Sequence, residues 1–195
     1  MAVLSRRFSV LAMRAARCVM LVLVFGVAAS RMAASQPPIA AEYQVKAAFL
    51  FNFAQFAEWP PKSFADGKAP IVIGIYGQDP FGEYLDNLVR DETVGGRTFV
   101  VRRIRQSDEI RGCHILFISR SEQQSVEKVL ARVRGAGVLT ISDTERFTYW
   151  GGMVNFVMDG GKVRLRVNAA AAKAAGLILS SKILRHATIV STGKD

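Results

Sequence analysis

The sequence is poor in cysteine: of its 195 residues only Cys18 and Cys113 are cysteines. Cys18 lies in an N-terminal segment that we expect to be removed on export, so a single thiol remains in the mature chain. A single thiol cannot form an intramolecular disulfide. The stability of the mature protein must therefore come from packing, and Cys113, which begins an apolar run, is expected to be a buried small hydrophobic residue and not a reactive group.

Histidine is equally scarce, and the groups that catalysis needs do not cluster. His114 adjoins Cys113 on an expected strand. Neighbouring side chains on a strand point to opposite faces, so these two cannot form a thiolate–imidazole pair. No spacing of His, Cys, Asp or Glu is typical of a zinc, iron or calcium site. The glycines near residue 77 do not match a nucleotide-binding loop. The sequence therefore predicts no enzyme, no metal and no cofactor.

The first 35 residues lack acidic side chains. Four arginines precede the apolar run from Val19 to Ala29, and small residues such as Ala34 and Ser35 follow it. This order predicts a signal peptide, residues 1–35, that is cleaved after Ala34 or Ser35, with cleavage after Ala29 as the alternative. The run is shorter than the roughly 20 apolar residues that span a bilayer, so an uncleaved anchor is the weaker interpretation. Cys18 precedes the run, which does not support a lipid anchor.

The positive charge of the whole chain comes partly from that segment. The chain carries 26 basic and 16 acidic side chains, and five of the arginines lie in residues 1–35. The mature chain keeps a modest, dispersed excess of basic residues, so no nucleic-acid partner is expected. Its densest basic stretch, Arg97 to Arg111, is interpreted as a solvated face. A surface for an anionic ligand or an acidic partner is the alternative interpretation.

The mature chain has about 160 residues, the length of one domain with a substantial core. Apolar runs that indicate strands alternate with segments that indicate helices: strands at 71–76, 98–104, 113–119 and 137–142, helices at 80–90 and 121–134. Strands that alternate with helices pair in parallel through crossover connections. We therefore expect one α/β domain, residues 36–195, with a mixed, mostly parallel sheet flanked by helices.

The last third of the sequence changes character. Two short strands, 153–158 and 162–167, are joined by Asp159, Gly160 and Gly161, which predicts a C-terminal β-hairpin. Two terminal helices follow, one capped by Asn168 and one that starts at Ser180 or Ser181. In the final helix we expect three residues to face inward, Ile183, Leu184 and Ala187, and three to face outward, Lys182, Arg185 and His186.

Residues 40–59 carry aromatic and apolar side chains at spacings of three and four, which predicts a helix that ends before Pro60 and Pro61. Phe51 and Trp59 extend the apolar surface beyond one stripe, so this helix is expected to be buried on more than one side. Core packing is the first interpretation of its aromatic residues, and a partner groove or a dimer face is the alternative.

Several stretches together resemble one family. They are Val45-Lys-Ala-Ala-Phe-Leu-Phe-Asn-Phe-Ala, Glu58-Trp-Pro, Gly74-Ile-Tyr-Gly, Asp79-Pro-Phe-Gly, His114-Ile-Leu-Phe-Ile-Ser, Val138-Leu-Thr-Ile-Ser-Asp, Gly151-Gly-Met-Val-Asn-Phe, Asn168 and Gly176-Leu-Ile-Leu-Ser-Ser-Lys-Ile-Leu-Arg. This ordered set resembles the YfiR-like family of periplasmic proteins over about residues 41–190. The resemblance implies regulation and not catalysis.

The best-known member of that family is a soluble periplasmic repressor. It binds the periplasmic sensor domain of an inner-membrane diguanylate cyclase, lowers cyclic-di-GMP synthesis and biofilm formation, can be sequestered by an outer-membrane lipoprotein, and can dimerise. The same partners are what the resemblance implies for this chain. That member also carries disulfides, so redox control through intramolecular bridges is not expected here, where the mature chain has one cysteine.

The leading hypothesis is therefore a periplasmic regulatory protein that acts by docking. Its candidate contact residues are Phe56 and Trp59, from the aromatic end of the first helix, and Lys182 and Arg185, from the last helix. A receptor for a small periplasmic solute, feeding another membrane sensor such as a histidine kinase, is the second hypothesis. An enzyme is the third and the least supported.

Overall fold

The computed structural model describes residues 38–193. The predicted signal peptide, residues 1–35, lies outside the described residues. Within the described part, no helix has both the length and the apolar character needed to span a bilayer. The elements are α2 (Pro38–Phe56), β1 (Ala57–Glu58), η1 (Pro61–Ser63), β2 (Ile71–Tyr76), α3 (Glu83–Val89), β3 (Phe99–Ile104), β4 (Ile115–Ile118), η2 (Arg120–Ser125), α4 (Val126–Val133), β5 (Leu139–Ser142), β6 (Val154–Asp159), β7 (Lys162–Val167), α5 (Ala169–Ala174), β8 (Ile178–Leu179), α6 (Ser181–Leu184) and β9 (Ala187–Ile189).

The main sheet has seven strands in the order β3-β2-β4-β5-β6-β7-β9. Strand β2 pairs in parallel with both β3 and β4, and the parallel pairing continues through β5 to β6. The strand order reverses at β2, as it does in doubly wound sheets that are covered on both faces. The expectation of an α/β domain with a mixed, mostly parallel sheet is confirmed.

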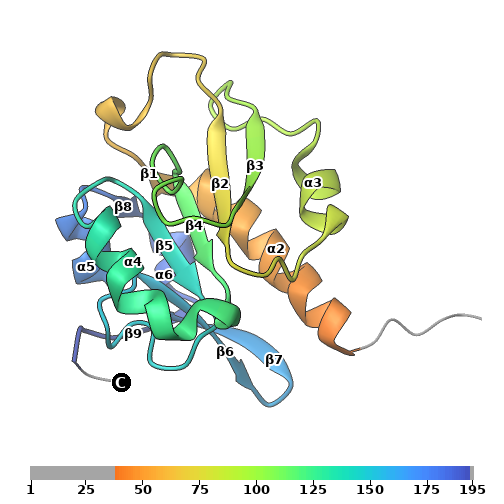
Figure 1. Cartoon of the computed structure of the whole chain (residues 1–195), viewed down its shortest axis with the longest axis vertical. Helices are drawn as coiled ribbons and strands as arrows, with labels where there is room; N and C mark the ends of the chain where they lie inside the picture. Colours follow the sequence, from red (N-terminus) through yellow and green to blue (C-terminus); the bar gives the residue numbers. More distant parts are fainter. Residues whose placement is uncertain (1–37, 194–195) are drawn as a thin grey trace, which may run out of the picture. The chain divides into compact units, whose positions relative to one another are not determined.

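The alternation of side chains along β4 divides the core into two layers. Ile115 and Phe117 point into a cluster with α2, α3, α5 and α6, whereas Leu116 and Ile118 point into a second cluster with α4. Figure 1 shows α4 in front of the sheet and α2 behind it. Both faces of the central strands are therefore buried, which explains why β4 consists entirely of apolar residues.

The predicted hairpin is present. Strands β6 and β7 pair antiparallel in a register that places Asp159 opposite Lys162. Gly160 and Gly161 form the two-residue turn with φ values of 54° and 74°. Positive φ at both positions matches the right-handed twist of the strands, and glycine adopts it without steric cost.

The predicted final helix is only partly correct. Helix α6 stops at Leu184, and Ala187 begins the short strand β9, which pairs in parallel with β7. The pairing of Ala187 with Leu165 outweighs a continued helix because residues 187–190 include the β-branched Thr188, Ile189 and Val190.

The first helix also ends earlier than expected, at Phe56. Beyond it, Ala57 and Glu58 pair with β8, and the backbone N–H of Ser180 donates to the carbonyl oxygen of Phe56 at 2.9 Å. Trp59 consequently lies outside the helix. Most of the circumference of α2 is covered, as expected, although Val45 remains 47% exposed.

Candidate functional site

A groove runs between α2, β7 and α6. Its volume is about 540 Å³, and its lining residues come from these three elements and from the turn after α6: Phe49, Asn52, Phe53, Phe56, Val163, Arg164, Leu165, Lys182, Ile183, Arg185 and His186. The groove forms because β9 and α6 bring the C-terminal segment back beside the first helix. We name it the docking groove, and three of the four residues predicted for partner binding, Phe56, Lys182 and Arg185, line it.

The docking groove has an apolar floor and a basic rim. Phe53 and Ile183 are buried in the floor, and Phe56 is half-buried at one end. The ammonium group of Lys182 lies 5.2 Å from the centre of the Phe56 ring, within the range of a cation–π contact. Arg185 is exposed, and the lining includes no acidic residue. An apolar floor with a cationic rim suits an acidic, amphipathic partner surface.

A second hollow continues the docking groove toward the start of α2. It shares Phe49 and Val163 with the groove and adds Val45 and Met158, which are 47% and 45% exposed. Large apolar side chains exposed next to one another are typical of interaction surfaces. One end of the combined surface is thus apolar and the other basic.

Trp59, the fourth predicted contact residue, does not line the docking groove. Its indole Nε1 donates a hydrogen bond to the carbonyl oxygen of His114 at 3.1 Å, and its ring meets the His114 ring edge to face. These contacts tie the segment after α2 to the start of β4. The structure therefore separates Trp59 from Phe56, Lys182 and Arg185.

His114 is a buried structural residue. The backbone N–H of Val72 donates to Nδ1 at 3.0 Å, and Nε2 lies 3.0 Å from the carbonyl oxygen of Ser63, so the contacts fix the neutral tautomer that carries its proton on Nε2. The ring stacks on Phe64, and burial lowers the pKa of His114 below its ordinary value. Cys113 is buried as expected, and burial raises the pKa of its thiol.

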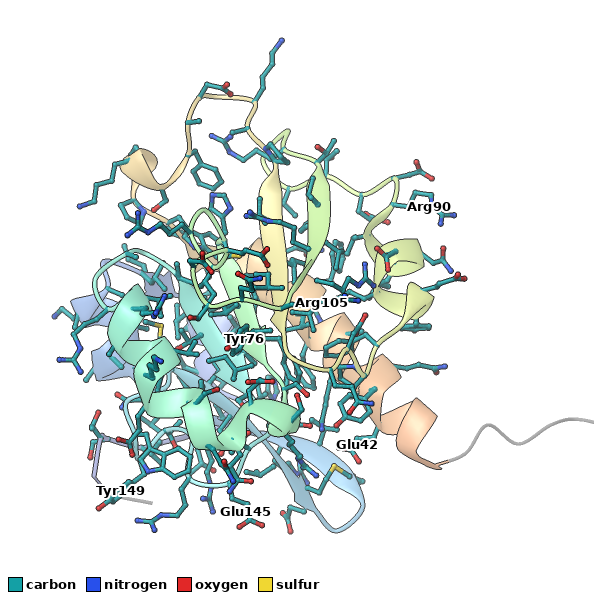
Figure 2. The ribbon with its side chains drawn as sticks, in the orientation of Figure 1. Glu42, Tyr76, Arg90, Arg105, Glu145 and Tyr149 are labelled. Carbon is teal, nitrogen blue, oxygen red and sulfur yellow. The ribbon has the colours of Figure 1, made fainter. Side chains whose placement is uncertain are left out.

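Sequence reasoning missed a buried cluster of charges at the carboxyl ends of β4 and β5. Lys46 is 1% exposed, and its Nζ lies 2.5 Å from Oδ2 of Asp143. Tyr43 donates its hydroxyl to the same oxygen at 2.8 Å. Glu42 pairs with Lys46 one turn earlier on α2, and Arg120 contacts the Asp143 carboxylate from the start of η2. In Figure 2, Glu42 lies on the first turns of α2 and Tyr76 at the carboxyl end of β2.

The cluster is asymmetric around Asp143. Oδ2 receives Lys46 and Tyr43, whereas Oδ1 is buried and has no hydrogen-bond partner among the described residues. In the sequence, Lys46 stands among the polar positions of the first helix, and Asp143 directly follows the apolar run at 137–142. The signal that could have identified Asp143 is its position directly after a parallel strand, where polar sites of α/β sheets gather. Among the described residues, no group of three or more His, Cys, Asp and Glu side chains could hold a metal ion.

Comparison with known proteins identifies the family of the chain and distant similarities among solved structures. Among solved structures, the chain is similar to one described as the ABC domain in complex with L-Trp from Streptococcus pneumonia, with 10% identity and a TM-score of 0.48. That match covers 78% of this chain and 60% of the other. No curated protein matches the chain. The family model DUF4154, described as YfiR/HmsC-like, matches residues 43–188, which is most of the sequence. The chain therefore belongs to the YfiR/HmsC-like family.

Proposed function

We propose that this protein docks on the periplasmic sensor domain of an inner-membrane diguanylate cyclase and represses it. At the level of the family, the chain is a periplasmic regulatory protein that interacts with a membrane sensor. The proposal goes further in naming the cyclase and the sign of the effect. Repression would lower cyclic-di-GMP in the cytoplasm and, with it, biofilm formation.

The observation that carries the proposal is the composition of the docking groove. An apolar floor that includes Phe53 and Ile183 supplies area to bury, and Lys182 and Arg185 supply charges at the edge. Interfaces with a buried apolar centre and a polar rim concentrate their binding energy in a few central residues. Phe56 is the aromatic residue of the docking groove that we expect to contribute most, because it is only half-buried and its ring lies next to the Lys182 ammonium.

Repression by docking needs no chemistry on the partner. A cyclase that exchanges between active and inactive arrangements moves toward the arrangement that the regulator binds more tightly. The size of the shift is limited by the difference between the two affinities. The rigid β7–α6–α2 surface is suited to this role because its floor residues are fixed in the core.

The test combines deletion with charge reversal. In a strain that lacks the gene, cyclic-di-GMP and surface attachment are expected to rise, and the unaltered gene is expected to restore them. Lys182→Glu and Arg185→Glu, which change exposed residues of the docking groove, are expected to fail in this restoration and to lose copurification of the cyclase. Lys128→Glu is the matched control, because Lys128 is also exposed but lies on α4, across the sheet.

Two results would end the proposal. One is a deletion strain with unchanged cyclic-di-GMP and no membrane cyclase among the proteins that copurify with the unaltered chain. The other is full restoration by both the Lys182→Glu and the Arg185→Glu variant, since each of them reverses a charge on the basic rim of the docking groove. Thermal unfolding of each variant shows that any loss comes from the surface and not from misfolding.

A further inference from the structure

A larger hollow lies on the other side of the molecule, at the amino ends of β4 and β5. Its volume is about 860 Å³, within the range of small-molecule sites. It is lined by residues before β4, residues before β5, the end of α4 and the turn after α2: Lys62, Ser63, Ser107, Asp108, Ile110, Arg111, Gly112, Cys113, Arg132, Val133, Ala136 and Val138. We name it the basic pocket. It shares no residue with the docking groove.

The wall of the basic pocket against the core is apolar. Ile110, Cys113, Val133 and Val138 are all buried and belong to the core layer around α4. The thiol of Cys113 is neutral, because burial raises its pKa. This wall can therefore bury an apolar group without leaving a charge unpaired.

The rim of the basic pocket is cationic. Lys62, Arg111 and Arg132 are exposed and, within residues 38–193, form no ion pair, while Asp108 is the sole acidic residue of the lining. Other arginines of the same stretch are already engaged. Arg103 binds Asp79 and Asp86.

Arg97 donates to two backbone carbonyl oxygens, those of Asp66 and Ala69. Arg97 and Arg103 both belong to the basic stretch seen in the sequence, and both are already bonded within the fold. Arg111 is different, because it lines the hollow and forms no ion pair with another described residue. Within the stretch, Arg97 and Arg103 therefore stabilise the fold, whereas Arg111, with Lys62 and Arg132, leaves positive charge unneutralised at the rim of the basic pocket.

We propose that the basic pocket binds a small organic anion that carries an apolar body. The apolar body would lie on Ile110, Val133 and Val138, and the anionic group would meet Arg111, Arg132 and Lys62. Unpaired cations above a wall of low polarity raise the local potential and favour a phosphate or carboxylate. Arginine forks bind such groups through paired hydrogen bonds. This inference does not depend on the docking groove, and it makes the protein a receptor as well as a regulator.

The test uses phenyl phosphate as the probe, with inorganic phosphate and phenol as its two halves and benzoate as the carboxylate analogue. Binding is followed by backbone amide NMR shifts and by calorimetry on the protein isolated from the periplasm. Phenyl phosphate is expected to shift the amides of Arg111, Cys113 and Val138 and to bind with a dissociation constant below about 1 mM. Each half alone is expected to bind at least about tenfold more weakly, because it uses only the wall or only the rim.

Three variants locate the site. Arg132→Ala is expected to weaken phenyl phosphate about tenfold, since a charged hydrogen bond contributes roughly that much. Lys128→Ala is the matched control, because Lys128 lies one turn earlier on α4, is exposed and does not line the basic pocket. Ala136→Trp places a large ring in the pocket from an exposed position and is expected to abolish binding without unfolding the protein.

Three outcomes would overturn the inference. The first is an absence of amide shifts around the basic pocket at about 10 mM probe, a concentration that detects even very weak binding. The second is equal loss of affinity in Arg132→Ala and Lys128→Ala, which would indicate a diffuse attraction to the basic surface. The third is unchanged binding in Ala136→Trp. None of these outcomes bears on the docking groove, so the two proposals fail separately.

Discussion

The Nζ atom of Lys46 lies 2.5 Å from the Oδ2 atom of Asp143, although 97 positions separate the two residues in the chain. The contact joins α2 to the end of β5. Both side chains are buried, with exposures of 1% for Lys46 and 0% for Asp143. Tyr43 completes the carboxylate's partners from the same helix. Burial and this hydrogen bond raise the pKa of Tyr43, so the phenol keeps its proton and acts as a donor.

Removing the lysine is expected to be costly. Lys46→Met leaves the Asp143 carboxylate buried without its nearest positive charge, and the loss of one partner of a buried pair costs about 3–5 kcal/mol. The measurement is the free energy of unfolding in urea. In the double variant Lys46→Met with Asp143→Asn, much of the loss is expected to return, because no buried negative charge remains. A Lys46→Met protein as stable as the unaltered protein would show that the pair contributes nothing.

Stability is expected to fall in mild acid because of His114. Burial holds the pKa of His114 below its ordinary value, so as the pH falls the unfolded chain takes up a proton first. The contribution of His114 to stability is therefore present above about pH 6.5 and is lost as the pH falls from there toward the folded-state pKa. Urea unfolding over this window measures the slope. His114→Gln is expected to flatten it, and an unchanged slope in this variant would assign the effect to other groups.

Trp59 and Phe56 are expected to behave differently on substitution. Trp59→Phe removes the hydrogen bond from the indole to the His114 carbonyl and is expected to lower the free energy of unfolding by about 1 kcal/mol. It should leave partner docking unchanged, because Trp59 does not line the docking groove. Phe56→Ala should weaken docking. Copurification of the partner and thermal unfolding, measured on both variants, separate the two effects, and a docking defect in Trp59→Phe would place the contact surface elsewhere.

The residues around Gly74 leave no room for a side chain. A Cβ atom at this position would lie 2.6 Å from the Cys113 sulfur and 2.8 Å from Cδ1 of Ile104. Gly74→Ala is therefore expected to destabilise the protein by about 1–3 kcal/mol through overpacking. Cys113→Ala removes one of the two clashing atoms, so the double variant should lose less than the sum of the single losses, as measured in urea. Strict additivity would mean that the two residues do not compete for space.

The regular part of the fold follows from local sequence signals. The β-branched run at residues 71–76 predicts strand β2 with its observed ends, and Gly160-Gly161 predicts the hairpin turn. In both cases the signal lies inside the element itself. Residues 187–189 carry a weaker local signal, and their strand forms only because β7 offers an edge to pair with. The predicted helix was therefore extended too far.

The candidate site was less accessible to sequence reasoning. Lys182 and Arg185 were named as contact residues only because the family resemblance suggested docking. Nothing in the sequence places them beside Phe56, since the Phe56–Lys182 contact joins the two ends of the domain. The burial of Lys46 could not be predicted, because its helical neighbours indicate an ordinary polar position and its partner is Asp143, far along the chain. Long-range electrostatic pairs leave no periodic pattern in a single sequence.

The three-residue strand β9 affects how incomplete or truncated forms of this chain behave. It covers β7, whose backbone groups would otherwise be open to pairing with any extended peptide. A nascent chain that has not yet been extended to residue 189 would leave the outer edge of β7 unpaired. A chain truncated there by a stop codon or a protease would do the same, and such an edge can pair with other chains. Because β9 is itself the last strand of the sheet and is only three residues long, the complete chain presents a shorter edge than the six-residue β7 would.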